Sequence, residues 1–130
     1  MNYSFTIPGT LPGLNEIIGA CRNNRYGAAK QKREVEARIL PCLRTLPPLR
    51  RPVTLYITWY EPDHTQTGRG RKKRDRDNIR AGAKFIQDAL VTAGKLPNDG
   101  WSEIKNIFDS YEASPWPGKV VVTILEGGDQ

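Results

Sequence analysis

The strongest strand signal in the chain is the stretch Val53-Thr54-Leu55-Tyr56-Ile57-Thr58-Trp59-Tyr60. Its inward and outward residues alternate, and it is rich in the β-branched and aromatic side chains that fit a pleated sheet. Pro62 ends the predicted strand, because proline has no backbone N–H to donate to a neighbouring strand. We therefore expect 53–60 to be a strand with one face buried beneath helices.

A helical pattern follows this strand after a polar, basic segment. Its apolar residues recur every three or four positions and form one stripe that should dock on the sheet. The stripe consists of Ile79, Ala83, Ile86, Leu90 and Ala93. Asp77 or Asn78 is expected to cap the start of this helix, and Gly94 is expected to stop it.

The rest of the chain supplies three further strands and one further helix. Alternation at the N-terminus predicts a strand through Ile7, and the patterns at 104–111 and 119–125 predict two more, joined by a turn at 113–118. A helix is predicted from Ala28 to Ile39, with a short helical turn at 14–18 and a loop at 21–27. The order strand-helix-strand-helix-strand-strand predicts a single α+β domain over 1–130, an α/β-like sandwich of a mixed sheet with about two main helices.

Composition points to a polyanionic partner. Twenty Lys and Arg against fourteen Asp and Glu give a formal charge of +6. No apolar run is long enough to cross a bilayer, and the N-terminus lacks a signal-peptide pattern, so we expect a cytoplasmic protein that binds no membrane. Cys21 and Cys42 are too few and too far apart for a zinc site or a disulfide framework, and are expected to be reduced thiols.

Two carboxylates lie directly against a run of cations. Asp75 and Asp77 are two residues apart, so an extended backbone would point both to the same side. Carboxylates repel phosphate, but Mg²⁺ held between carboxylate and phosphate removes the conflict. Asp99 is a third candidate ligand if the loop after Gly94 returns it to the pair. Each aspartate also has a structural alternative: a charge partner of neighbouring arginines for Asp75, a helix cap for Asp77, a turn residue for Asp99.

Cations around these aspartates are candidates for contact with phosphate. Lys84 lies nearly two helical turns after Asp77 and so faces the same side, where it could hold a scissile phosphate; the alternative is an ordinary surface pair with Asp88. Trp101 and Tyr60 are candidates to stack on bases, or else belong to the core or its rim. The predicted nucleic-acid-binding residues are Arg69, Arg71, Lys72, Lys73, Arg74, Arg76 and Arg80.

At these residues the chain resembles the RusA family of Holliday-junction resolvases of bacteria and their prophages. The resemblance is carried by a basic run, an Asp-x-Asp-Asn motif, an Asp-Ala-Leu helix motif and an acidic loop before an apolar residue. These are Arg71-Lys72-Lys73-Arg74, Asp75-Arg76-Asp77-Asn78, Asp88-Ala89-Leu90, and Asn98-Asp99 with Ile104. The opening Phe5-Thr6-Ile7-Pro8 with Asn15 is also similar to the family's N-terminal strand and loop.

The resemblance implies a homodimeric endonuclease that uses Mg²⁺ or Mn²⁺, without a small-molecule cofactor, to nick two opposed strands of a four-way DNA junction. It implies metal-binding catalytic roles for Asp75, Asp77 and Asp99 and a catalytic role for Lys84. Two departures matter. The segment between Asp77 and Asp88 is about one turn longer than the family pattern, so Arg80 is an alternative to Lys84. Asn98 replaces one carboxylate of the family's loop, which makes Glu103 a substitute candidate.

Two other functions fit the same residues. A non-catalytic basic module would bind nucleic acid and use the aspartates only as caps and charge partners. A metal-dependent nuclease of broader specificity for branched substrates would share the site but not the junction preference, because junction shape is recognised by the surface of a dimer and not by a motif.

Overall fold

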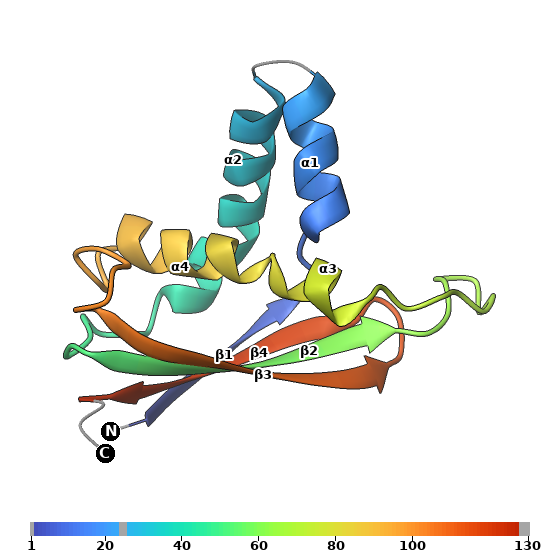
Figure 1. Cartoon of the computed structure of the whole chain (residues 1–130). Coiled ribbons are helices and arrows are strands. Elements are labelled where there is room, and N and C mark those ends of the chain that lie inside the picture. The colour runs from blue at the N-terminus through green and yellow to red at the C-terminus, as the bar shows by residue number, and fades with distance from the viewer. Residues whose placement is uncertain (1, 24–25, 128–130) are drawn as a thin grey trace.

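The computed structural model describes residues 2–23 and 26–127, and its centre is one mixed sheet (Figure 1). The strand order is β1-β4-β2-β3. Strand β2 (Val53–Pro62) is parallel to β3 (Ile104–Ser114) and antiparallel to β4 (Lys119–Glu126), which in turn is antiparallel to β1 (Asn2–Pro8). The predicted α+β class with a mixed sheet is confirmed, as are the four predicted strands.

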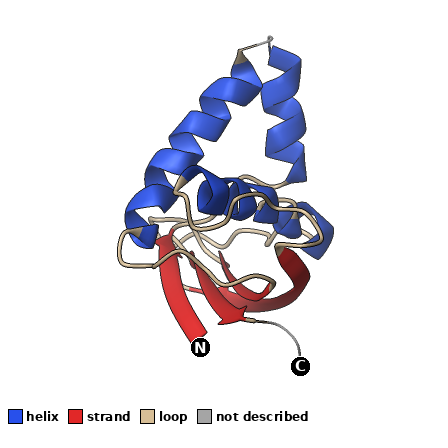
Figure 2. Cartoon of the chain, turned by 90° about the vertical axis from the view of Figure 1, so that its left-hand side faces the viewer, coloured by secondary structure: helices blue, strands red, loops and turns tan. Residues whose placement is uncertain are grey.

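The helices lie on one side of this sheet (Figures 1 and 2). Helices α3 (Arg76–Arg80) and α4 (Ala83–Thr92) run along the face of the sheet. Helices α1 (Leu14–Asn23) and α2 (Gly27–Ile39) lie side by side and project away from it, and a short 3-10 helix η1 (Leu40–Leu43) follows α2. Among the residues that the structure describes, helices therefore cover only one face of the sheet.

The core forms between the covered face and the apolar stripe of α3 and α4. Leu55, Ile57 and Trp59 of β2 are buried, as the alternation in 53–60 predicts. The register pairs Ile57 with Val122 of β4, which is also buried. From the helices, the buried residues of the stripe are Ile79, Ala83, Ile86 and Leu90, while Ala93 packs against the core at its edge.

The predicted helix over 77–93 is two helices, which corrects both its continuity and its start. The helix is interrupted at Gly82. An added Cβ there would lie 3.1 Å from Leu11 Cβ and from Pro12 O, so this turn packs directly against the loop after β1. The helix begins at Arg76, and Asp75 occupies the cap position without a side-chain hydrogen bond to the helix. The prediction that Asp77 or Asn78 caps the helix is therefore wrong. The prediction that Gly94 stops it is confirmed, because Gly94 follows α4 with a φ of 74°.

The N-terminal segment is also more helical than predicted. A single turn was expected at 14–18 and a loop at 21–27, but α1 spans ten residues and includes Cys21, while α2 begins at Gly27. Within the expected loop, residues 24 and 25 lie outside the described residues. The cause is long-range packing: Ile17 packs on the core, and the missing side chain of Gly27 lets α2 approach the backbone of Ala20 closely.

Strands β3 and β4 are consecutive in the chain but are not neighbours in the sheet. β2 lies between them, so the turn at 115–118 crosses the end of β2. Gly118 makes this crossing possible: its φ is 80°, and an added Cβ would lie 2.5 Å from Tyr60 O and 2.9 Å from Pro62 Cδ. A side chain would therefore collide with the backbone of the strand beneath.

We predict that Gly118→Ala destabilises the protein more than Gly94→Ala. Both glycines have positive φ, which costs an alanine roughly 1–2 kcal/mol, but nothing lies within 4 Å of a Cβ at Gly94. The collision at Gly118 should add to the backbone cost, and the free energies of unfolding from urea titrations measure the difference. An equal loss in the free energy of unfolding for the two variants would show that the turn can move away from β2 without cost.

Candidate active site

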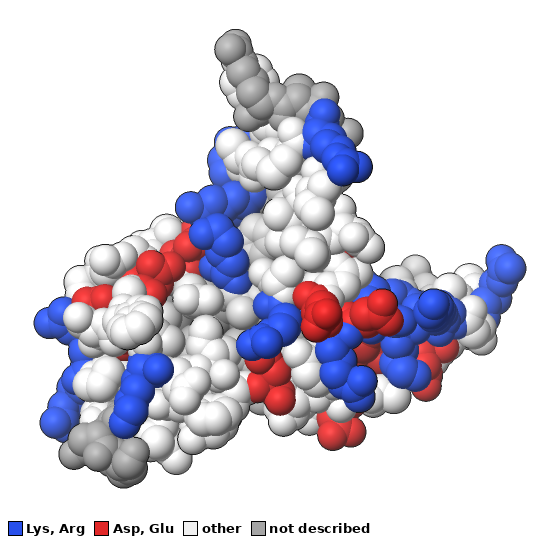
Figure 3. Space-filling model, in the orientation of Figure 1, with Lys and Arg blue, Asp and Glu red and all other residues white. Residues whose placement is uncertain are grey.

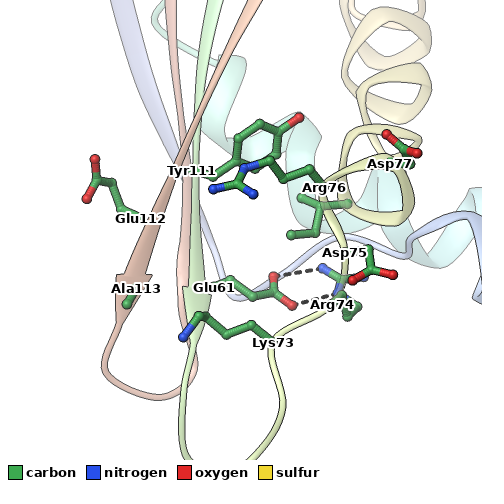
Figure 4. Close-up of a pocket in the computed structure, with 10 residues that line it drawn as sticks. Glu61, Lys73, Arg74, Asp75, Arg76, Asp77, Tyr111, Glu112 and Ala113 are labelled. Atoms are coloured by element: carbon green, nitrogen blue, oxygen red, sulfur yellow. Dashed lines mark hydrogen bonds and ion pairs between the residues drawn. The ribbon is translucent and has the colours of Figure 1, made fainter.

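A hollow of about 400 Å³ lies beside α3, at the end of the sheet where β2 and β3 terminate (Figure 4). It gathers two of the predicted aspartates, several cations and the C-terminal part of β3. The lining residues are Glu61, Lys73, Arg74, Asp75, Arg76, Asp77, Ile79, Tyr111, Glu112 and Ala113.

A buried ion pair fixes the backbone at the entrance to α3. Arg74 donates from Nε to Glu61 Oε2 at 2.6 Å and from Nη2 to Glu61 Oε1 at 2.9 Å. Its Nη1 donates to Leu11 O at 3.0 Å and to Glu16 Oε1 at 2.9 Å. The side chains of Arg74 and Glu61 are only 15% and 5% exposed. Arg74 was predicted to contact nucleic acid, and the structure corrects this: its guanidinium is used inside the protein.

The surroundings of Arg74 shift the pKa of its guanidinium. Burial alone would lower the pKa of Arg74, but hydrogen bonding and charge from Glu61, and then from Glu16, outweigh it and raise the pKa. The guanidinium therefore stays charged at any physiological pH. It holds the chain immediately before Asp75 in a fixed place.

A second contact fixes α3 itself. Asn78 Oδ1 accepts a hydrogen bond from the Asn15 backbone N–H at 3.0 Å, so the start of α1 is tied to α3. Gly13 permits this approach, because a Cβ there would lie 2.5 Å from Asn78 Oδ1. The Asp-x-Asp-Asn segment is thus anchored on both sides, by Arg74 before it and by Asn78 at its end.

Asp75 and Asp77 are exposed and unpaired on this anchored segment. Among the residues that the structure describes, no hydrogen bond or ion pair engages either carboxylate. Arg74 points to Glu61, and the guanidinium carbon of Arg76 lies 5.4 Å from the ring centre of Tyr111. The structural alternatives for the two aspartates, a cap and a charge partner, are therefore not observed. Both carboxylates are free to bind a cation in the hollow.

Asp99 does not join this pair within one chain. It precedes the start of β3, whereas Tyr111 in the hollow is near the end of that strand, and seven strand residues span roughly 23 Å. Helix α4 carries the chain away from the hollow, and the loop after Gly94 leads into β3 without turning back. No cluster of three potential metal ligands occurs among residues 2–23 and 26–127. The predicted convergence in one chain is not observed.

Glu103, the substitute candidate, is used elsewhere. It is buried, its Oε1 accepts from the Gly100 backbone N–H at 3.1 Å, and its Oε2 lies 3.5 Å from Arg51 Nη1. It stabilises the turn that carries Asp99 and is not available as a ligand.

Neither Lys84 nor Arg80 lines the hollow. The break at Gly82 cancels the helical spacing that placed Lys84 beside Asp77. The Lys84 side chain is 75% exposed, with Nζ 3.9 Å from Asp88 Oδ2, so the surface pair is observed. Arg80 lies 3.0 Å from Asp109 Oδ2. The cations that do line the hollow are Lys73, Arg74 and Arg76, and Arg74 is paired with Glu61.

The sequence patterns missed three residues of the site: Glu61, Asp109 and Tyr111. Asp109 accepts a hydrogen bond from Trp59 Nε1 at 2.8 Å and ion-pairs with Arg80, which joins β3 to α3. Burial, reinforced by the charge of Asp109, raises the pKa of Tyr111 above its usual 10.0. Strand pairing is the signal that places them, because Tyr111 lies opposite Trp59 on the covered face of the sheet.

The basic segment before Asp75 forms a hydrogen-bonded loop beyond the end of β2. Thr65 N–H donates to Arg69 O at 2.6 Å and Arg71 N–H donates to Asp63 O at 3.1 Å. Arg71 packs over Trp116, while Arg69 and Lys72 are exposed. Figure 3 shows blue cationic side chains gathered around red acidic ones at this end of the molecule. Of the predicted phosphate-binding residues, Arg74, Arg80 and Arg71 pair with acids of the protein, Arg71 with its Nη2 3.7 Å from Glu61 Oε2. The others, Arg69, Lys72, Lys73 and Arg76, are exposed.

Comparison with models of known protein families gave no match, and comparison with curated protein sequences gave none either. In the part of the chain that the structure describes, every helix is too short or too polar to cross a bilayer.

We predict that Arg74→Ala lowers the free energy of unfolding by about 3 kcal/mol, because it leaves Glu61 buried without its main partner. Arg69→Ala is the matched control, since an exposed arginine of the same loop should change stability by less than about 0.5 kcal/mol. Urea denaturation of both variants measures this. Similar stabilities for the two would mean that Arg74 acts at the surface, as the basic run suggested.

Proposed function

We propose that this protein is a metal-dependent DNA endonuclease, and that it resolves four-way junctions by paired nicks. The observation that carries the proposal is the pair Asp75 and Asp77, unpaired carboxylates in a hollow that Lys73 and Arg76 also line. Carboxylates that served only structure would be neutralised by the arginines beside them. Carboxylates left free beside a phosphate-binding surface suit a divalent cation shared with the phosphate.

The residues fit such a cation. Mg²⁺ is commonly held by one or two carboxylates together with water and substrate phosphate, so Asp75 and Asp77 form an adequate donor set. When bound, the cation would polarise the phosphate and activate water for attack. Lys73 and Arg76 line the same hollow and would neutralise the phosphate oxygens, and Arg69 and Lys72 would bind the backbone on either side.

The position of Asp99 suggests how a dimer would complete the site. Because Asp99 lies far from Asp75 and Asp77 within one chain, it could join them only as the Asp99 of a second protomer. The resemblance implies a homodimer, and in that arrangement each hollow would use the Asp99 of the other protomer. The preference for junctions follows from the resemblance, and the cytoplasmic location expected from the sequence is a further part of the proposal.

A second candidate is a non-catalytic DNA-binding module. It is favoured by one observation: among the described residues of a single chain, no group of three potential metal ligands occurs. Such a module would bind DNA in a salt-dependent manner, indifferent to Mg²⁺, and would cut nothing.

We predict that Asp77→Asn reduces cleavage of a synthetic four-way junction in Mg²⁺ by about 100-fold or more, since the charge stabilisation that a metal provides is worth several kcal/mol. Binding to the junction should be kept or strengthened, because a repelling charge is removed. The assay compares the junction with a matched linear duplex, in Mg²⁺ and in EDTA.

The control for this variant is Glu34→Gln, which removes an exposed charge from α2, where Glu34 pairs with Lys30. It should cut at the wild-type rate. Wild-type cleavage by Asp77→Asn would refute the metal site, and a wild-type protein that binds the junction without cutting it in Mg²⁺ or Mn²⁺ would favour the binding module.

We also predict that Asp77→Asn and Asp99→Asn, each inactive alone, regain activity when mixed. In a mixed dimer one hollow carries both substitutions, whereas the other has intact Asp75, Asp77 and Asp99, so one strand should be nicked. Gel analysis of a labelled junction after subunit exchange measures this. If the mixture stays inactive although exchange is verified, Asp99 does not act across the dimer.

A further inference from the structure

Trp101 is the most exposed of the large apolar side chains. It is 96% exposed, compared with 41% for Trp116 and 2% for Trp59. Tryptophan carries the largest apolar surface of any residue and is usually well buried. A tryptophan displayed to this degree needs an explanation, and the site described above does not supply one.

The turn that displays Trp101 is firmly held. Ile104 N–H donates to Gly100 O at 2.9 Å, and Glu103 Oε1 accepts from Gly100 N–H. Val53 N–H donates to Glu103 O at 2.8 Å, which ties the turn to the start of β2. The indole therefore projects from a backbone that is fixed before a ligand binds.

The turn and the segments beside it are rich in cations. The backbone N–H of Leu49 donates to Lys95 O at 2.9 Å, so the segment with Arg50 and Arg51 lies beside Lys95. Lys105 follows the turn on β3, and Figure 3 shows both cationic and acidic side chains at this end of the molecule, on its left. Of the two acids in the turn, Glu103 is buried and paired with Arg51. The turn and the segments beside it thus contain four cations, Arg50, Arg51, Lys95 and Lys105, against Asp99 and the paired Glu103.

We propose that Trp101 stacks on an unpaired base of DNA, with the surrounding cations neutralising the adjacent phosphates. The choice of DNA as the ligand rests on the proposed function. Every base offers a flat aromatic face, and stacking on protein aromatics next to cations is the general mode of binding unpaired strands. Bases inside a duplex are already stacked on both sides, so Trp101 selects a strand end, a single strand or a branch point.

Although the proposed dimer would bring this turn to the partner's hollow through Asp99, a second copy of the chain fits the indole itself less well. Aromatic anchors of protein interfaces lie within apolar, well-packed surroundings. The residues next to Trp101 are Asn98, Asp99, Gly100 and Ser102, and no other exposed large apolar residue belongs to this turn. An isolated indole among polar and cationic groups matches a nucleotide, which presents an aromatic ring and a phosphate together.

The test uses tryptophan fluorescence in EDTA, where nothing is cut. In a Trp116→Phe background the remaining tryptophans are Trp101 and the buried Trp59, whose indole donates to Asp109. We expect a thymidine oligonucleotide to quench the fluorescence and an abasic oligonucleotide of equal length to leave it unchanged. Trp101→Ala should weaken binding of the thymidine oligonucleotide by about 10-fold, the usual size for one stacked base, and Trp101→Tyr should restore most of it.

Phe108→Ala is the matched control, because Phe108 is an exposed aromatic on the uncovered face of the sheet, stacked on Tyr56. It should bind both oligonucleotides as the parent does. Equal quenching by the abasic oligonucleotide, or unchanged affinity in Trp101→Ala, would overturn the inference. So would conversion of a dimer into a monomer by Trp101→Ala in sedimentation, which would show that a second copy covers the indole.

Failure of this inference is distinguishable from failure of the proposed function. A protein that cuts junctions in Mg²⁺ but shows no base-dependent quenching would refute the role of Trp101 alone. A protein that shows the quenching but cuts nothing would refute the nuclease and keep Trp101 as a base-stacking residue of a binding module.

Discussion

The buried pair of Arg74 and Glu61 is the contact on which the site depends. Taking both charges out of water is costly, and the cost is offset only because the two groups meet in a bidentate geometry and the remaining donor of Arg74 reaches Leu11 O and Glu16. One guanidinium thereby joins the end of β2, the loop after β1 and the start of α1. Asp75 follows Arg74 in the chain, so the contacts of Arg74 with these three elements fix the position of Asp75.

Asp75 and Asp77, together with the exposed Glu112 of the same hollow, contrast with the buried acids of the fold. Glu61, Glu103 and Asp109 are all buried or nearly so and are matched by donors, as burial of a carboxylate requires. The two aspartates at α3 are exposed and have no such partner among the described residues. This division of the acids, into those that the fold neutralises and those that it leaves charged, is what distinguishes a candidate site from a solvated surface.

Much of the framework could be predicted from the sequence, because alternation and helical spacing are local signals. The strand at 53–60, the stripe from Ile79 to Leu90 and the stop at Gly94 all follow from neighbours within a few residues. The errors have long-range causes. Gly82 breaks a helix because it meets Leu11, which is distant in sequence, and α1 extends because it packs on the core.

The same distinction applies to the site. Asp75 and Asp77 are exposed, as expected for polar residues beside a basic run. The sequence does not distinguish Arg74 from the other cations of that run, because its partner Glu61 lies on strand β2. Asp99 was expected to return to the pair because a loop of unknown path leaves that possibility open. Only the direction of β3 shows that it does not. Local chemistry could be read from the sequence, whereas the partners of each group could not.

The insertion of β4 between β1 and β2 has a consequence for the order of folding. β1 comes first in the chain, yet its only neighbour in the sheet is β4, which comes last of the four strands. During synthesis β1 therefore has no strand to pair with until the chain has emerged through Glu126, and one edge of β2 stays open for the same time. Pairing of these strands depends on contacts between residues that are distant in sequence, which slows folding. Strand edges stay exposed until the pairing is complete. A nascent chain of this topology therefore carries unpaired strand edges until its last strand has been made.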